Sequence, residues 1–106
     1  MLNISIVLYK PLWQQVVALT QSLLGFDGVH HIYWIDNSPT AIQELPISSK
    51  KLHYIFNNKN IGYGAAHNIA FRESIYDDVP FHLVINPDII ITPKALSTLV
   101  TFIQQN

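Results

Sequence analysis

The chain of 106 residues has a length typical of one small domain. Apolar residues make up 49% of it and charged residues 12%, about half of the ~25% usual in proteins, so the chain can build a core while part of its surface is uncharged or covered by a partner. The net charge of −1 without a basic run argues against a nucleic-acid-binding protein, and the absence of cysteine excludes disulfides and zinc–thiolate centres.

The first half of the chain predicts three strands and one long helix. β-Branched residues are frequent in residues 3–9, which indicates a buried strand that Lys10-Pro11 ends. Leucine and valine recur at helical spacing over residues 12–24, and Gly25 is a common residue type just after a helix. Further strands are expected over residues 31–36 and 52–56, separated by turn residues at 37–40 and one helical turn over 41–45.

The second half predicts two helices and one clear strand. Gly62 and Gly64 interrupt the chain before a helix expected over residues 65–74. Residues 81–85 form an apolar strand that Pro87 ends, because proline cannot donate a hydrogen bond to a sheet. A short strand is expected over residues 89–91, followed by a helix over 93–103 with Thr92 as its N-cap and Pro93 in its first turn.

Strands alternate with helices, which is typical of an α/β fold with a three-layer, Rossmann-like, mainly parallel sheet. Right-handed crossovers place the carboxyl ends of the first, second and fourth strands on one rim. No linker or repeat divides the chain, so we expect one domain over residues 1–106. Because the sequence has no signal-peptide pattern and no apolar stretch of the ~18 residues that cross a bilayer, we expect a cytoplasmic protein, soluble or peripheral at the inner face of the membrane.

Two segments at this rim have residues suited to a ligand. Asp36 follows the second strand, where its carboxylate could accept hydrogen bonds from a base or a ribose; a turn residue bonded to its own backbone is the commoner role. Asn60 and Asn68 flank a loop whose glycines permit close approach of a ligand, ahead of a helix N-terminus that favours anions. The loop lacks the third glycine of a dinucleotide fingerprint and the Gly-Lys-Ser/Thr of a Walker loop.

The third segment, Asn86-Pro87-Asp88, has the most specific pattern. Pro87 ends the strand and exposes Asp88, and a single carboxylate can hold Mg²⁺ or Mn²⁺ when diphosphate and water complete the coordination shell. Asn86 could hydrogen-bond a ribose hydroxyl, although a strand-end turn explains these residues equally well. Tyr9 ends the first strand on the same rim and could stack on a base, while a place in the core is the commoner one.

The five histidines are expected to be structural. None forms a pair at i, i+4 spacing on a predicted helix. His30 and His31 are neighbours in the chain, so their side chains are expected on opposite faces of a strand. Trp13 and Trp34 are expected to pack in the core.

The order and spacing of the three motifs resemble those of family 2 glycosyltransferases, most closely the bacterial rhamnosyltransferase-like branch. The resemblance rests on Asp36-Asn37-Ser38, on residues 60–68 and on Asn86-Pro87-Asp88, and it extends over essentially the whole chain. It implies the N-terminal, donor-binding part of a GT-A fold. It also implies inverting transfer from a nucleotide-diphosphate sugar to a saccharide or lipid-linked saccharide, in the synthesis of bacterial surface polysaccharide.

The resemblance also assigns roles to single residues. Asp88 is implied to hold the divalent cation, Mg²⁺ or Mn²⁺, on the diphosphate. Family members usually continue well past this motif, and their later part supplies the acceptor surface and the general base, so we assign no catalytic residue and expect little transfer by this chain alone. The low charge fits an apolar face buried in a homodimer. Implied contacts to the base are Tyr9 and Asp36, and those along the donor pocket are Asn60, Gly62 and Asn68.

Two other functions stay open at this point. A sugar-phosphate nucleotidyltransferase has a related sheet, but its first strand leads into a glycine-rich, basic loop, whereas this chain has no glycine between Leu8 and Leu12. A non-enzymatic α/β interaction module would need no metal and would bind no nucleotide.

Overall fold

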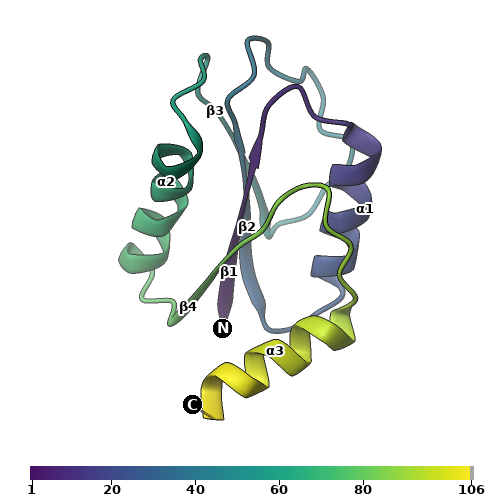
Figure 1. Cartoon of the computed structure of the whole chain (residues 1–106), viewed down its shortest axis with the longest axis vertical. Helices are drawn as coiled ribbons and strands as arrows, with labels where there is room; N and C mark the ends of the chain where they lie inside the picture. Colours follow the sequence, from purple (N-terminus) through teal and green to yellow (C-terminus); the bar gives the residue numbers. More distant parts are fainter. Residues whose placement is uncertain (106) are drawn as a thin grey trace.

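The computed structural model describes residues 1–105. Four parallel strands form one sheet with helices on both faces, which confirms the predicted α/β fold of Rossmann type (Figure 1). In chain order the elements are β1 (Leu2–Leu8), α1 (Trp13–Leu24), β2 (Val29–Asp36), β3 (Leu52–Phe56), α2 (Tyr63–Tyr76), β4 (Phe81–Val84) and α3 (Pro93–Gln105).

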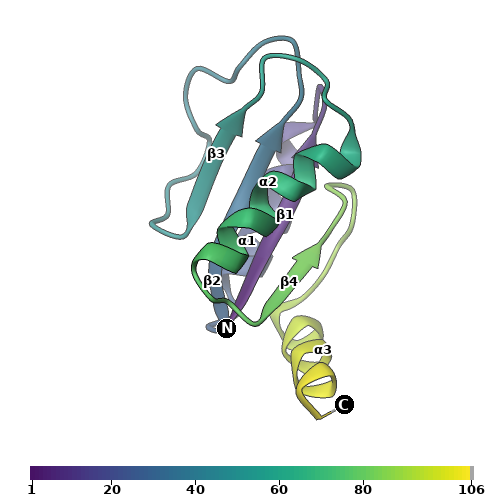
Figure 2. The ribbon, with the colours of Figure 1, turned by 90° about the vertical axis from the view of Figure 1, so that its left-hand side faces the viewer.

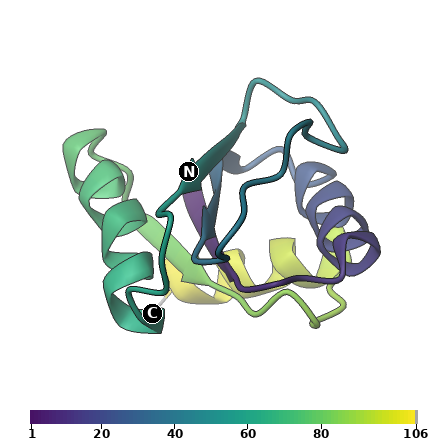
Figure 3. The ribbon, with the colours of Figure 1, turned by 90° about the horizontal axis from the view of Figure 1, so that it is seen from above.

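The strand order is β3-β2-β1-β4 (Figure 2). The chain adds β2 and β3 on one side of β1 and then crosses to the other side for β4, so the order reverses at β1. Seen from above, α1 covers one face of the sheet and α2 the other (Figure 3). In open α/β sheets, the crevice outside the carboxyl ends of the strands at such a reversal is where ligands bind.

The larger core lies between the sheet and α1. Trp34 of β2 is fully buried there, and its indole N–H donates to Thr20 Oγ1 over 3.0 Å. The Thr20 hydroxyl donates in turn to the Val16 carbonyl over 2.7 Å, so the polar atoms inside this core are paired. Its other buried members include Ile4, Ile6 and Leu8 of β1, Leu19 and Leu23 of α1, and Leu96 and Val100 of α3.

The core under α2 is smaller. Ala66 and Ala70 of the helix are fully buried against Tyr33 and Ile35 of β2. Because alanine has the smallest side chain of this kind, α2 can lie close to the sheet. Val7 of β1 packs against this cluster, and Phe71 of α2 lies against the ring of His82 of β4. Polar side chains make up the rest of the contact described below.

Five polar side chains, four of them buried and one (His82) half-buried, form a chain of hydrogen bonds between β1, β4 and α2. Asn3 donates to Ser74 Oγ over 2.9 Å, and Ser74 Oγ lies 2.7 Å from His82 Nδ1. His82 Nε2 lies 2.8 Å from Ser5 Oγ, which is 2.6 Å from His67 Nδ1. Burial, and then the neighbouring His67, lower the pKa of His82 to about 4, and burial lowers the pKa of His67. Both rings are therefore neutral at pH 7.

A β-bulge at the start of β2 overturns the expectation for His30 and His31. Leu2 pairs with Val29 and Asn3 with His31, so His30 is an extra residue in β2. The bulge places the two imidazoles together, with ring centroids 4.0 Å apart, instead of on opposite faces. The His31 backbone N–H donates to Asn3 Oδ1 over 2.9 Å, which pairs a donor at the point where the ladder is disrupted.

Three local predictions are also wrong. Residues 41–45 form no helical turn, because Pro46 disfavours the α conformation at the preceding residue. Residues 89–91 form no strand: Ile89 N–H donates to the Asn86 carbonyl over 3.2 Å and turns the chain out of the sheet. Helix α2 begins at Tyr63, so Gly64 lies within its first turn. The N-cap of α3 is confirmed, since Ala95 N–H donates to Thr92 Oγ1 over 3.1 Å.

Apolar side chains account for part of the low-charge surface. Ile75, Tyr76 and Ile90 are 80%, 86% and 94% exposed. Within residues 1–105, no helix has the length and apolar character that crossing a bilayer requires.

His82 makes the fold sensitive to mild acid. Its pKa of about 4 in the folded state lies below the 6.5 of the unfolded state, so the unfolded chain binds this proton more tightly. The free energy of unfolding is therefore highest above pH 6.5 and falls as the pH is lowered toward 4. A shift of this size amounts to about 3 kcal/mol, and partial exposure of the ring reduces it to about 1–2 kcal/mol. Urea unfolding across this pH interval measures the effect.

The variant His82→Gln retains hydrogen-bonding atoms for Ser5 and Ser74 but does not titrate, so it should flatten the pH dependence. Ser97→Ala, a substitution of an exposed residue of α3 that does not titrate and lies outside this hydrogen-bonded chain, is the control and should keep the slope. Equal slopes for the wild type and His82→Gln would contradict the assignment.

Candidate functional site

The carboxyl ends of the parallel strands are joined by hydrogen bonds across the rim. The Lys10 backbone N–H, just after β1, donates to Ser38 Oγ after β2 over 2.7 Å. Lys10 has a positive φ of 45°, which turns the chain sharply out of the strand. Asn37 Oδ1 accepts a hydrogen bond of 2.8 Å from Asn57 Nδ2, which follows β3.

The start of α2 is tied to the same place through Asn37. Its side-chain amide donates to Asn60 Oδ1 and to the Gly62 carbonyl, each over 3.3 Å. Asn60 Oδ1 also accepts the Gly62 N–H over 3.0 Å. Gly62 has φ +91° and ψ 160°, a conformation that other residues rarely adopt, and no atom lies within 4 Å of where its Cβ would be.

The Asn-Pro-Asp segment joins this group through α2. The Tyr63 hydroxyl donates to Asn86 Oδ1 over 3.0 Å. The three segments singled out in the sequence therefore lie at one rim, and hydrogen bonds connect them. Asn37 and Tyr63 make these connections, although neither was predicted as a site residue.

Asp36 is a turn residue bonded to the local backbone, which is the commoner of the two roles considered from the sequence. Its carboxylate is 1% exposed; Oδ1 accepts the Ser38 N–H over 2.9 Å and Oδ2 accepts the Tyr54 hydroxyl over 2.6 Å. Burial, together with this bond to Asp36, raises the pKa of Tyr54 to about 12, so the phenol remains a donor. Asp36 nevertheless lines a hollow of about 440 Å³, together with Lys10, Pro11, Trp13, Ser38, Pro39, Thr40, Ala41 and Ile42.

Tyr9 lies on the surface rather than in the core. It is 53% exposed at the end of β1, and Lys10 Nζ is 5.4 Å from its ring centroid. The commoner expectation for this residue is therefore wrong, and its ring is open to a ligand. The core positions are held by Trp34, and by Trp13, whose ring centroid lies 5.6 Å from that of Trp34.

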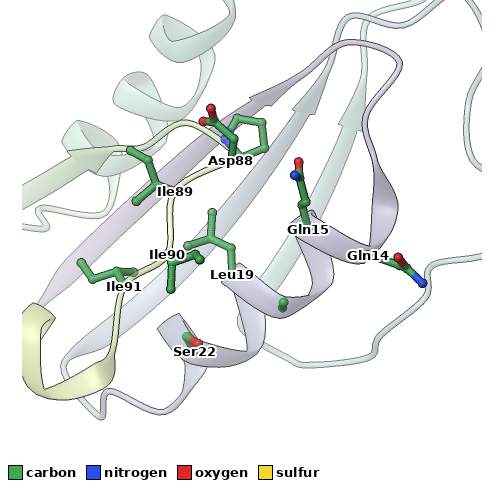
Figure 4. A pocket seen from close by; sticks show the side chains of 10 residues that line it. Gln14, Gln15, Leu19, Ser22, Asp88, Ile89, Ile90 and Ile91 are labelled. Carbon is green, nitrogen blue, oxygen red and sulfur yellow. The ribbon is translucent and has the colours of Figure 1, made fainter.

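Asp88 is exposed on the loop that leaves β4. It lies at one end of a mostly apolar cleft of about 360 Å³ between this loop and α1. The apolar side chains of Leu19 and Ile90 lie further along the cleft (Figure 4). The remaining lining of the cleft consists of Gln14, Gln15, Ala18, Ser22, Pro87, Ile89 and Ile91.

Asn68, the last residue of the second motif, is exposed in α2 beside the buried His67.

The two glycines at the start of α2 should respond in opposite ways to alanine. Gly62→Ala places a side chain at a φ of +91° and should lower the free energy of unfolding by about 1–3 kcal/mol. Gly64→Ala is its matched control: it lies within the helix with open space around it and should raise the free energy by about 0.5–1 kcal/mol. Urea unfolding of both variants measures this, and a neutral Gly62→Ala would refute the backbone assignment.

The comparisons with known proteins place this arrangement in a family. A sequence model of Glycosyl transferase family 2 matches residues 35–106, more than half of the chain and a range that includes all three motifs. No curated protein and no solved structure matches the chain. The parallel four-stranded sheet is consistent with the N-terminal part of a GT-A fold, and enzymes of this family transfer sugars from nucleotide-sugar donors to acceptors. The chain therefore belongs to glycosyl transferase family 2.

Proposed function

We propose that the rim binds the nucleotide diphosphate of a sugar donor and that the chain is the donor-binding part of an inverting glycosyltransferase. The proposed acceptor is a saccharide or lipid-linked saccharide, in the synthesis of bacterial surface polysaccharide at the cytoplasmic face of the membrane. The observation that supports this most is the convergence of the three motif segments: Asn37 bonds to Gly62, and Tyr63 bonds to Asn86, where the strand order reverses.

The hollow at the ends of β1 and β2 is the proposed site of the nucleoside. Its volume of about 440 Å³ is within the range of small-ligand pockets. The buried Asp36 carboxylate can accept a hydrogen bond from a base N–H beside its existing ones, since each carboxylate oxygen has two lone pairs. The exposed ring of Tyr9 offers a surface on which a base can stack.

The start of α2 is the proposed neighbour of the diphosphate. Helix N-termini favour anions because their first backbone N–H groups are unpaired and their dipole is positive. No atom lies within 4 Å of the missing side chain at Gly62, so a phosphate can approach this backbone closely. Asn60 precedes Gly62 in the chain and Asn68 follows it; both are exposed, so their side-chain amides can hydrogen-bond the donor.

Asp88 is the residue proposed to hold Mg²⁺ or Mn²⁺. Its exposed carboxylate is a hard oxygen ligand, and Mg²⁺ takes one or two carboxylates when phosphates and water supply the rest. Asn86 Oδ1 already accepts the Tyr63 hydroxyl, so Asn86 fits a donor-positioning role better than a metal-binding one. When bound, the cation offsets the negative charge that develops on the departing diphosphate.

No general base is assigned among residues 1–105. Asp77 and Asp78 follow the C-terminus of α2, and Glu73 lies in its last turn. The helix begins at the rim and has 14 residues, so Asp77 and Asp78 lie about 20 Å from the rim and Glu73 about 15 Å from it. The residues identified at the rim bind and orient a donor, and we expect little transfer by this chain alone.

Replacing Asp88 should remove the metal-dependent part of nucleotide binding. Asp88→Asn keeps the size of the side chain but loses its charge, so Mn²⁺ should no longer strengthen binding of a nucleoside diphosphate, a loss of at least about tenfold. Titration calorimetry with UDP, GDP and dTDP, each with and without Mn²⁺, measures this. Asp78→Asn, an exposed aspartate at the other end of α2, is the matched control and should bind as the wild type does.

An unchanged effect of Mn²⁺ in Asp88→Asn would exclude Asp88 as the metal ligand. If no nucleoside diphosphate gives a binding signal in calorimetry, with or without Mn²⁺, the donor-binding proposal fails. The chain is then better described as an interaction module.

Tyr9→Ala should weaken nucleotide binding with or without metal. Stacking on an aromatic ring is worth about 0.5–1.5 kcal/mol, which corresponds to a loss of about two- to tenfold. Tyr76→Ala removes another exposed tyrosine, at the far end of α2, and should have no effect. The same calorimetric titrations test both, and equal affinities for Tyr9→Ala and the wild type would remove Tyr9 from the site.

A second copy of the chain is a further proposed partner. Exposed apolar side chains such as Ile75 and Ile90 could be buried in a homodimer. Sedimentation equilibrium distinguishes a dimer from a monomer.

A further inference from the structure

A second group of ligand-type side chains lies at the end of the sheet opposite the rim. His30 and His31 are at the start of β2, and Asp77 follows the last residue of α2. One ligand atom from each lies within 4.8 Å of the others. We propose that these three residues bind a borderline transition-metal ion of the Zn²⁺ type, at a site separate from the proposed donor site.

The β-bulge creates this group. In a regular strand His30 and His31 would point to opposite faces, whereas the extra residue opposite Leu2 and Asn3 brings their ring centroids to 4.0 Å. The Asn3 side chain supports the bulge, because its Oδ1 accepts the His31 backbone N–H over 2.9 Å. The backbone of the bulge, which a buried asparagine supports, therefore brings the two imidazoles together.

His53 supplies an outer partner for one of these ligands. Its Nε2 lies 2.9 Å from Nδ1 of His31. When His31 carries its proton on Nδ1 and donates it to His53, the Nε2 atom of His31 is free to bind a metal. Metal-binding histidines usually donate their other N–H in this way, which fixes the tautomer and the ring orientation. The ring of His53 is itself stacked on Tyr33, with centroids 5.2 Å apart.

Asp77, at the C-terminal end of α2, is the third proposed ligand. Ligands of a tetrahedral zinc ion at 2.0–2.2 Å from the metal are about 3.4 Å apart. The three atoms lie within 4.8 Å of one another, so they must move closer by at most about 1.4 Å, and the exposed Asp77 side chain can rotate to do so. A cation is also favoured here by the negative end of the α2 dipole.

The chemistry of the donors separates this site from the one at Asp88. Two imidazole nitrogens and one carboxylate oxygen suit Zn²⁺, with water in the fourth position, whereas Mg²⁺ prefers oxygen ligands. A surface hollow of about 700 Å³ beside His31, His53, Glu73 and Asp77 gives an ion access from solvent. The bound ion would join the C-terminal end of α2 to the first residues of β2.

The test is a titration of the untagged chain with Zn²⁺, followed by calorimetry and by thermal unfolding. We expect one ion per chain and a rise in Tm with Zn²⁺ concentration, because a ligand of the folded state stabilises it. His30→Gln and Asp77→Asn should each weaken binding at least tenfold, and His53→Gln about 10- to 100-fold through loss of the outer partner. Asp78→Asn, the exposed neighbour of Asp77, should bind as the wild type does.

The visible spectrum of bound Co²⁺ provides a second readout, since a four-coordinate site gives intense absorption that His30→Gln should abolish. Circular dichroism of each variant without metal shows whether it is folded. The proposal is overturned if Zn²⁺ binds folded His30→Gln and Asp77→Asn as tightly as the wild type, or if it does not bind the wild type. It is also overturned if Asp88→Asn abolishes Zn²⁺ binding, since the ion would then lie at the rim. His30→Gln should keep Mn²⁺-dependent nucleotide binding, so the two proposals can fail separately.

Discussion

The side-chain amide of Asn37 is the constraint on which the geometry of the rim depends. It is 2% exposed, accepts a hydrogen bond from Asn57 and donates to Asn60 and to the Gly62 carbonyl. Its backbone N–H donates to the Leu8 carbonyl over 2.8 Å. One residue thereby connects the ends of three strands with the start of α2. Only an amide offers a donor and an acceptor side by side for this, so an aspartate or a leucine at this position would leave buried groups unpaired.

Local patterns predicted the elements of this fold well, because each strand and helix has its own apolar periodicity. They failed where a distant residue decides the conformation. The bulge at His30 depends on pairing between β1 and β2, which no window of β2 contains. Residues 89–91 have strand-type side chains, yet the turn at Asn86 directs them away from the sheet and Ile91 against the core instead.

The candidate site was predictable to the extent that its residues follow strands. Asp36 and Asn86 were placed on one rim by the rule that parallel strands end together, and the loop around Gly62 was expected to meet them there. The connections between them were not, since Asn37 and Tyr63 look like an ordinary turn residue and an ordinary helix residue in the sequence. The exposure of Tyr9 also escaped prediction, because an aromatic residue at the end of an apolar strand has the same local pattern whether it is buried or exposed.

Helix α2 relates the two ends of the molecule. Its N-terminus lies at the rim beside Gly62, where its positive dipole end favours the diphosphate proposed there, and its C-terminus lies beside Asp77, where the negative end favours a cation. Between them, His67 and Ser74 bond the helix to β1 and β4 through the neutral ring of His82. Because this buried chain fixes the helix along its length, an ion at Asp77 would act on the donor site only through a nearly rigid element. The two sites are therefore expected to bind their ions independently. The different ligand atoms at the two ends also favour a different metal at each.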